Sequence, residues 1–118
     1  MGKHLLAAGL LLAVSATPAL ADIRAAFGNT IVSRYPDGGT VRHYFDADGT
    51  YAARFSDGRS LTGRWVIEGS QVCLNQIRPR IMLISRFCTE MRVAEVGDSW
   101  QSRDPLGRRV SNQLVAGR

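Results

Sequence analysis

Asp46 and Asp48, separated by one residue and followed by Gly49, have the spacing with which an EF-hand calcium loop begins. Such a loop carries glycine at its sixth position and glutamate at its twelfth, whereas here glycine is fourth and Asp57 is twelfth. Apolar residues alternate on both sides of the stretch, which is typical of strands. The sequence therefore predicts a hairpin turn at 46–49 and no metal site.

His43 is the one histidine outside the N-terminal segment that could perform acid–base chemistry. A hydrolase that uses His43 with a serine and an aspartate is one alternative, although no G-x-S-x-G elbow is present. The alternation instead places His43 beside Val41 and Phe45 on an inward face, as a buried structural histidine. The acids that a glycosidase pair would need fall mostly in expected turns: Asp46, Asp48, Asp57, Glu68, Glu90 and Glu95. No catalytic residue and no cofactor is therefore assigned.

Cys73 and Cys88 are the only cysteines, and they predict a disulfide. In a single hairpin this pairing also places Gln76 opposite Ser85. A metal site with two cysteines would need further ligands, and His43 is the only histidine outside the N-terminal segment that could supply one.

The N-terminus has the pattern of a secretory signal peptide. Lys3 precedes the apolar run 5–14, and Ala-Leu-Ala at 19–21 forms a cleavage signal. The run is too short for a membrane span. The sequence predicts a signal peptide over 1–21 and a single secreted β domain over 22–118, located in the periplasm or outside the cell, where disulfides persist.

The charge pattern favours anionic partners over nucleic acid. The formal net charge is +5, and Lys3 is the only lysine, so nearly all cationic side chains are arginines. They are spread along the chain without the basic run that a nucleic-acid site needs. Attraction to anionic lipid headgroups or acidic glycans is one interpretation, and an ordinary solvated basic surface is the other.

The chain from Thr30 onward predicts an all-β antiparallel meander of eight or nine short strands, since apolar residues alternate between glycine-containing turns. We expect strands at 30–35, 40–45, 50–55, 61–68, 71–77, 86–96, 98–104 and 108–117, with a further turn near 79–81. A small barrel or sandwich would protect the edges, and a flat sheet is the alternative. A short N-terminal helix is expected over 22–27, capped by Asp22 and ended by Gly28.

Arg42, Arg54 and Arg64 have the outward parity on three neighbouring strands, and Tyr44 shares it. These four residues are the predicted binding surface, with a solvated sheet face as the alternative. Large aromatic side chains could also line a pocket in a barrel mouth: Tyr35, Tyr44, Tyr51, Trp65 and Trp100. The alternative is that Trp65 and Tyr51 fill the core and the others cover its rim.

The motifs Gly-Asn-Thr at 28–30, Phe-Asp-Ala-Asp-Gly at 45–49 and Gly-Arg-Trp at 63–65, followed by the cysteine pair, resemble a family of small secreted β-domain proteins from alphaproteobacteria. The resemblance covers residues 23–88. It implies an exported β domain and carries no activity, cofactor or site residue.

These features together predict a non-enzymatic binding module for an anionic or amphipathic component of the cell envelope, lipid or glycan. A structural or protein-interaction role in the envelope is the alternative, and the hydrolase that uses His43 is a second one. No nucleic-acid partner and no membrane span in the mature chain are expected.

Overall fold

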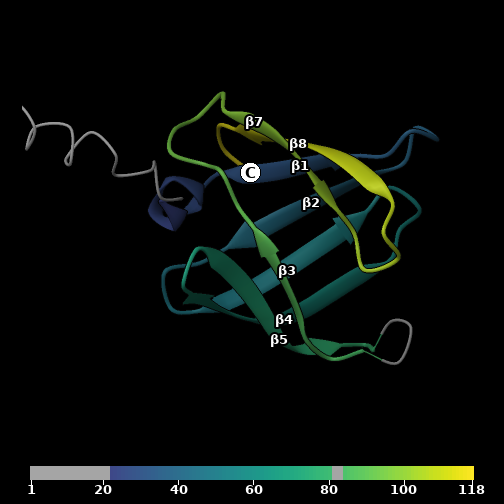
Figure 1. Ribbon diagram of the computed structural model, residues 1–118, viewed down its shortest axis with the longest axis horizontal. Coiled ribbons are helices and arrows are strands. Elements are labelled where there is room, and N and C mark those ends of the chain that lie inside the picture. Colours follow the sequence, from purple (N-terminus) through teal and green to yellow (C-terminus); the bar gives the residue numbers. More distant parts are fainter. Residues whose placement is uncertain (1–21, 81–83) are drawn as a thin grey trace, which may run out of the picture.

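The computed structural model describes residues 22–80 and 84–118, and within them the chain forms one antiparallel sheet (Figure 1). The predicted signal peptide, residues 1–21, and the end of the predicted turn at 79–81 lie outside the described residues. The strands are β1 (Thr30–Arg34), β2 (Thr40–Phe45), β3 (Thr50–Phe55), β4 (Ser60–Glu68), β5 (Gln71–Arg78), β6 (Phe87–Glu90), β7 (Ser99–Arg103) and β8 (Arg109–Val115). In the described ranges no helix is long and apolar enough to cross a membrane.

The sheet curls into a nearly closed barrel. Its strand order is β6-β5-β4-β3-β2-β1-β8-β7, so the last strands return to pair with the first. β6 and β7 are the two ends of the sheet and lie close together, but no ladder joins them in the described part of the chain. The predicted all-β meander is confirmed, and its shape is that of a barrel with a seam between β6 and β7.

Alternation along the strands separates the interior from the surface, as expected for a barrel. Val41 and Phe45 on β2 and Tyr51 and Ala53 on β3 are buried, whereas their outward neighbours are more exposed. Leu114 on β8 has no exposed surface and belongs to the same core cluster.

A single 3-10 turn replaces the expected N-terminal helix. Residues Ile23–Ala26 form this turn, η1, in which the Phe27 amide bonds the Arg24 carbonyl at 3.1 Å. The predicted cap is present, since the Asp22 side chain accepts from the Arg24 amide. The amides of Ala25 and Phe27 each bond the carbonyl three residues earlier, which is the pattern of a 3-10 helix. The turn covers one end of the barrel, where Ile23 is buried.

The predicted strand at 86–96 is shorter than expected, because only Phe87–Glu90 pairs as β6. The carboxylate of Asp98 accepts hydrogen bonds from the backbone amides of Ala94 and Glu95, at 2.8 and 2.9 Å. These bonds bend the chain into a turn in place of a ladder. Val93 is carried into the core with no exposed surface.

The predicted disulfide is confirmed: Cys73 and Cys88 lie directly opposite each other on β5 and β6 and are bonded. They are 15 residues apart in the sequence. Closing a loop of this length stabilises a fold by roughly 3 kcal/mol in the chain-entropy model. The bond therefore holds the short edge strand β6 against the sheet.

A bulge in β5 requires a glycine on the facing strand. The register between β4 and β5 shifts at this point, and Gln76 has a φ of 53°. The Ile77 amide bonds the Ser85 carbonyl at 3.2 Å, which offsets the predicted pairing of Gln76 with Ser85 by one residue. A Cβ on Gly63 would lie 2.9 Å from the Asn75 carbonyl oxygen.

We expect Gly63→Ala to destabilise the protein by about 1–3 kcal/mol, since the added methyl meets backbone that cannot move aside. Urea denaturation measures the loss. The control is Gly39→Ala, whose Cβ would meet side chains and no backbone, namely those of Asp37 at 3.2 Å and Ser56 at 3.9 Å. Equal losses in the two variants would contradict the bulge as the cause.

Candidate functional site

The barrel interior contains a cavity of about 310 Å³ with mainly apolar walls. Its aromatic lining comes from Tyr35, Phe45, Tyr51, Phe55, Phe87 and Trp100. A cavity of roughly 150 Å³ accommodates benzene in another protein, so this one has room for about a dozen non-hydrogen atoms. The size is at the lower end of the range for small-molecule pockets.

The two ends of the barrel differ. At the end covered by η1, Trp65 packs against Phe27 and Phe45, with ring centroids 5.8 and 6.4 Å away, and it does not line the cavity. Of the predicted pocket aromatics, Tyr35, Tyr51 and Trp100 line the cavity, whereas Tyr44 and Trp65 do not. Trp65 is partly buried and packs against the core.

Charged residues line the cavity at the opposite end, near the β3–β4 and β7–β8 turns. Arg108 forms an ion pair with Asp104 at 2.9 Å, and its guanidinium lies 4.8 Å from the centre of the Tyr35 ring. Burial, helped by Asp104, raises the pKa of Tyr35 to about 12. Arg59 and Arg103 also line this end. The cavity thus joins an apolar interior to a rim rich in arginine.

A chain of hydrogen bonds crosses the cavity wall. Tyr51 Oη lies 2.8 Å from His43 Nδ1, and His43 Nε2 lies 2.9 Å from Ser33 Oγ. Ser33 Oγ donates to Asn112 Oδ1 at 2.6 Å, and Asn112 Nδ2 donates to Ser102 Oγ at 2.9 Å. These residues come from β3, β2, β1, β8 and β7 in turn. The sequence placed His43 on the inward face but gave no sign of its partners.

His43 is neutral at physiological pH. Burial lowers its pKa to about 4, because the charged imidazolium is poorly solvated inside the barrel. Burial likewise raises the pKa of the Tyr51 phenol well above its usual value. The hydrogen-bonded series from Tyr51 to Ser102 is therefore an uncharged network of donors and acceptors.

The four residues of the predicted binding surface do not form one continuous group in the structure. Arg42 and Arg54 are exposed and lie directly opposite each other on β2 and β3. Arg64 lies further along β4 and donates to the Asp48 carbonyl at 3.0 Å. The guanidinium of Arg118 lies 5.2 Å from the centre of the Tyr44 ring and partly covers it. Of the predicted surface, only Arg42 and Arg54 form a close pair.

Two further arginines extend that pair. Arg34 on β1 is the diagonal neighbour of Arg42, and Arg109 on β8 is the diagonal neighbour of Arg34. Diagonal neighbours are roughly 7–8 Å apart. We call Arg34, Arg42, Arg54 and Arg109 the arginine band; all four are exposed, and none forms an ion pair with another described residue. Sequence reasoning missed Arg34 and Arg109, because only the pairing of the first strand with the last brings them to this face.

Most of the acidic side chains considered for catalysis or calcium binding lie on the surface, where Asp46 and Asp48 bond other surface residues. Asp46 pairs with Arg118 at 2.7 Å, and Asp48 accepts from the amide and hydroxyl of Thr50 at 3.0 and 2.7 Å. The two bonds between Asp48 and Thr50 lie within the predicted hairpin turn and help to close it. Of the six glycosidase candidates, Glu90 alone lines the cavity.

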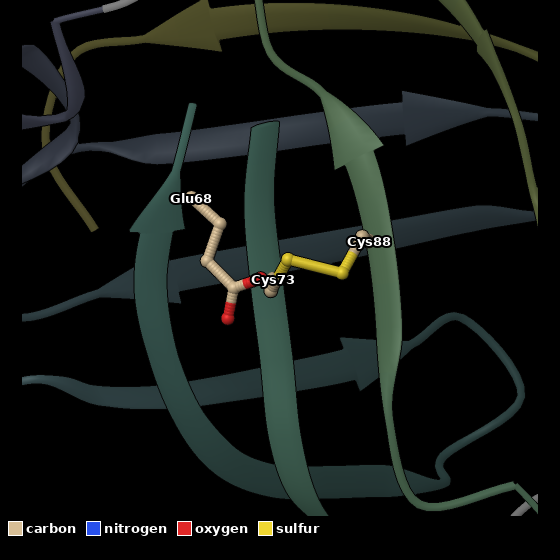
Figure 2. A group of neighbouring side chains, drawn as sticks. All are labelled: Glu68, Cys73 and Cys88. Carbon is tan, nitrogen blue, oxygen red and sulfur yellow. A yellow bond between two sulfur atoms is a disulfide. The ribbon is translucent and has the colours of Figure 1, made fainter. Parts of the chain in front are cut away.

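Glu68, Cys73 and Cys88 form the one cluster of potential metal ligands among the described residues (Figure 2). Figure 2 shows the carboxylate of Glu68 beside the bonded sulfur atoms. Zinc is held by thiolates, and neither cysteine is a thiolate here because both are in the disulfide. Glu68 instead pairs with Arg86 at 2.7 Å.

Comparison with known proteins gave no match to any protein-family model, any curated protein or any solved structure. Function is therefore inferred from the cavity and the outer face alone.

We expect the folded protein to lose roughly 3 kcal/mol of stability between pH 7 and pH 4 through His43. In the unfolded chain this histidine protonates near pH 6.5, whereas in the folded chain it stays neutral down to about pH 4. The unfolded state binds the extra proton in this window, so stability falls as the pH falls through it. Urea denaturation at a series of pH values measures the slope.

The control for this prediction is His43→Gln. Surface carboxylates contribute equally to the pH dependence of the unfolding free energy in both proteins. Their contribution therefore cancels when one stability profile is subtracted from the other. The variant is expected to be less stable at pH 7 and to have a flatter profile. Parallel profiles would show that His43 does not cause the acid sensitivity.

Proposed function

We propose that this protein is a non-enzymatic binding module whose barrel interior accommodates a small amphipathic ligand of the cell envelope. The cavity of about 310 Å³ carries the proposal. Its apolar walls suit a short hydrocarbon body. At its rim, Arg103 forms no ion pair with another described residue, whereas Arg59 and Arg108 are paired with Asp57 and Asp104, so Arg103 suits an anionic or strongly polar end. The disulfide fits an oxidising compartment, in keeping with a periplasmic or secreted location.

The surroundings of His43 support a binding role over a hydrolytic one. In a serine hydrolase the histidine bonds a carboxylate through one ring nitrogen and the nucleophile through the other. Here Nδ1 faces the Tyr51 phenol at 2.8 Å, and Nε2 faces Ser33. A neutral phenol does not stabilise an imidazolium as a carboxylate does.

Decanoate tests the proposal, since its chain length suits the cavity and its carboxylate suits the rim. We expect one molecule to bind per chain and to alter the fluorescence of Trp100, which lines the cavity. Val110→Phe fills part of the cavity and is expected to weaken binding by about tenfold. Calorimetric titration gives the affinities.

The matched control is Val66→Phe, which adds the same ring at an exposed position on β4. It should leave decanoate affinity unchanged. Equal weakening by both variants, or no binding to the wild-type protein, would overturn the cavity as the binding site.

The arginine band supports a second candidate, the binding of anionic surfaces through the outer face. Like charges directly opposite each other across a sheet repel, and Arg42 and Arg54 have no acidic partner within the described ranges. Phosphate or carboxylate groups of a lipid or glycan would relieve this repulsion. Arg42 and Arg54 are two of the four residues of the predicted binding surface, and the proposed surface adds Arg34 and Arg109 to them.

The double variant Arg42→Ser, Arg54→Ser is expected to bind phosphatidylglycerol vesicles about thirtyfold more weakly, since each arginine near an anionic surface contributes ~1 kcal/mol. Co-sedimentation measures the binding. The control, Arg24→Ser with Arg92→Ser, removes the same charge from residues already paired with acids, at 2.9 and 3.2 Å. Equal losses in both proteins would assign the effect to net charge.

A further inference from the structure

The hydrogen-bonded chain in the cavity wall has a defined direction. Asn112 Nδ2 lies 3.3 Å from the Trp100 carbonyl oxygen and 2.9 Å from Ser102 Oγ. A backbone carbonyl only accepts, so the amide nitrogen of Asn112 must face it. Its other atom, Oδ1, therefore faces Ser33 Oγ at 2.6 Å and must receive a proton from it.

The remaining protons follow from this orientation. Ser33 has one proton and gives it to Asn112, so it accepts from His43 Nε2–H. The neutral ring then has no proton on Nδ1, which accepts from the Tyr51 hydroxyl at 2.8 Å. Every donor thus points along the chain toward Ser102.

Ser102 receives the last of these bonds and has its own proton left over. Within the described residues no acceptor takes the Ser102 Oγ proton. Ser102 lies on β7 and lines both the main cavity and a second hollow of about 370 Å³ at the seam with β6. Its hydroxyl therefore presents a donor at the side of the cavity nearest the seam.

We infer that the cavity selects ligands with an acceptor oxygen of the carbonyl type, bound by the Ser102 hydroxyl. The inference rests on the proposed function, since it requires that the cavity hold a ligand. Ser102 Oγ carries the one proton of this hydrogen-bonded series that no described residue accepts, so the ligand atom that Ser102 can bind with that proton is an acceptor. A ketone, ester or amide oxygen would complete the chain, whereas a hydrocarbon of the same shape would leave the donor unpaired.

Acetophenone and α-methylstyrene test this selection, because they differ only in a carbonyl oxygen in place of a methylene. Both are titrated by NMR into the wild-type protein and into Ser102→Ala. We expect the variant to bind acetophenone about fivefold more weakly and to bind α-methylstyrene as the wild type does. Unchanged α-methylstyrene affinity shows that the cavity itself is intact.

Ser102→Thr keeps the hydroxyl and is expected to restore acetophenone affinity. If Ser102→Ala binds both probes like the wild type, or if decanoate binds and neither probe does, the carbonyl inference is overturned while the cavity function stands. If decanoate and both probes fail to bind the wild type, the proposed function fails, and this inference fails with it.

Discussion

The hydrogen-bonded chain from Tyr51 to Ser102 is the constraint on which the barrel depends. An unpaired buried polar group costs about 1–3 kcal/mol, and no buried side-chain nitrogen or oxygen lacks a partner among the described residues. A one-residue slip of any strand would turn its side chains to the opposite face. Because the chain links β3, β2, β1, β8 and β7, such a slip would leave several polar atoms unpaired at once.

The hydrogen-bonded residues from Tyr51 to Ser102 also affect how the barrel interior is filled. At one end Trp65, Phe27 and η1 close the barrel with apolar contacts. Around His43 and Asn112 the inward positions carry polar side chains, and the space beside them stays hollow. An empty apolar cavity forfeits dispersion contacts, so a small domain that keeps one is stabilised when a ligand occupies it.

Local pattern was sufficient for much of the fold. The strands expected at 40–45 and 50–55 have the bounds of β2 and β3, since alternation and the Asp-Gly turns act over a few residues. The cysteine pair likewise gave the register of β5 with β6. The strand expected at 86–96 ends early, at Glu90, because beyond it the Asp98 side chain competes with the ladder for backbone amides.

The candidate sites depended on contacts between distant strands. Ser33 and Asn112 meet because the last strand returns to the first, and the same pairing brings Arg34 beside Arg109. Period-two alternation identifies which side chains face inward but not which of them touch. Neither the polar chain nor the full arginine band could therefore be derived from the sequence.

The direction of the hydrogen bonds from Tyr51 to Ser102 decides which atom receives the Ser33 proton. A general base at His43 would need Nε2 to accept the Ser33 proton, yet the Trp100 carbonyl orients Asn112 so that this proton goes to Oδ1. Reversing the chain would place an amide oxygen against that carbonyl, an acceptor facing an acceptor. The bond that keeps Ser33 from being activated is also the bond that leaves the Ser102 proton unused. The arrangement that argues against a nucleophile therefore favours a cavity that recognises an acceptor.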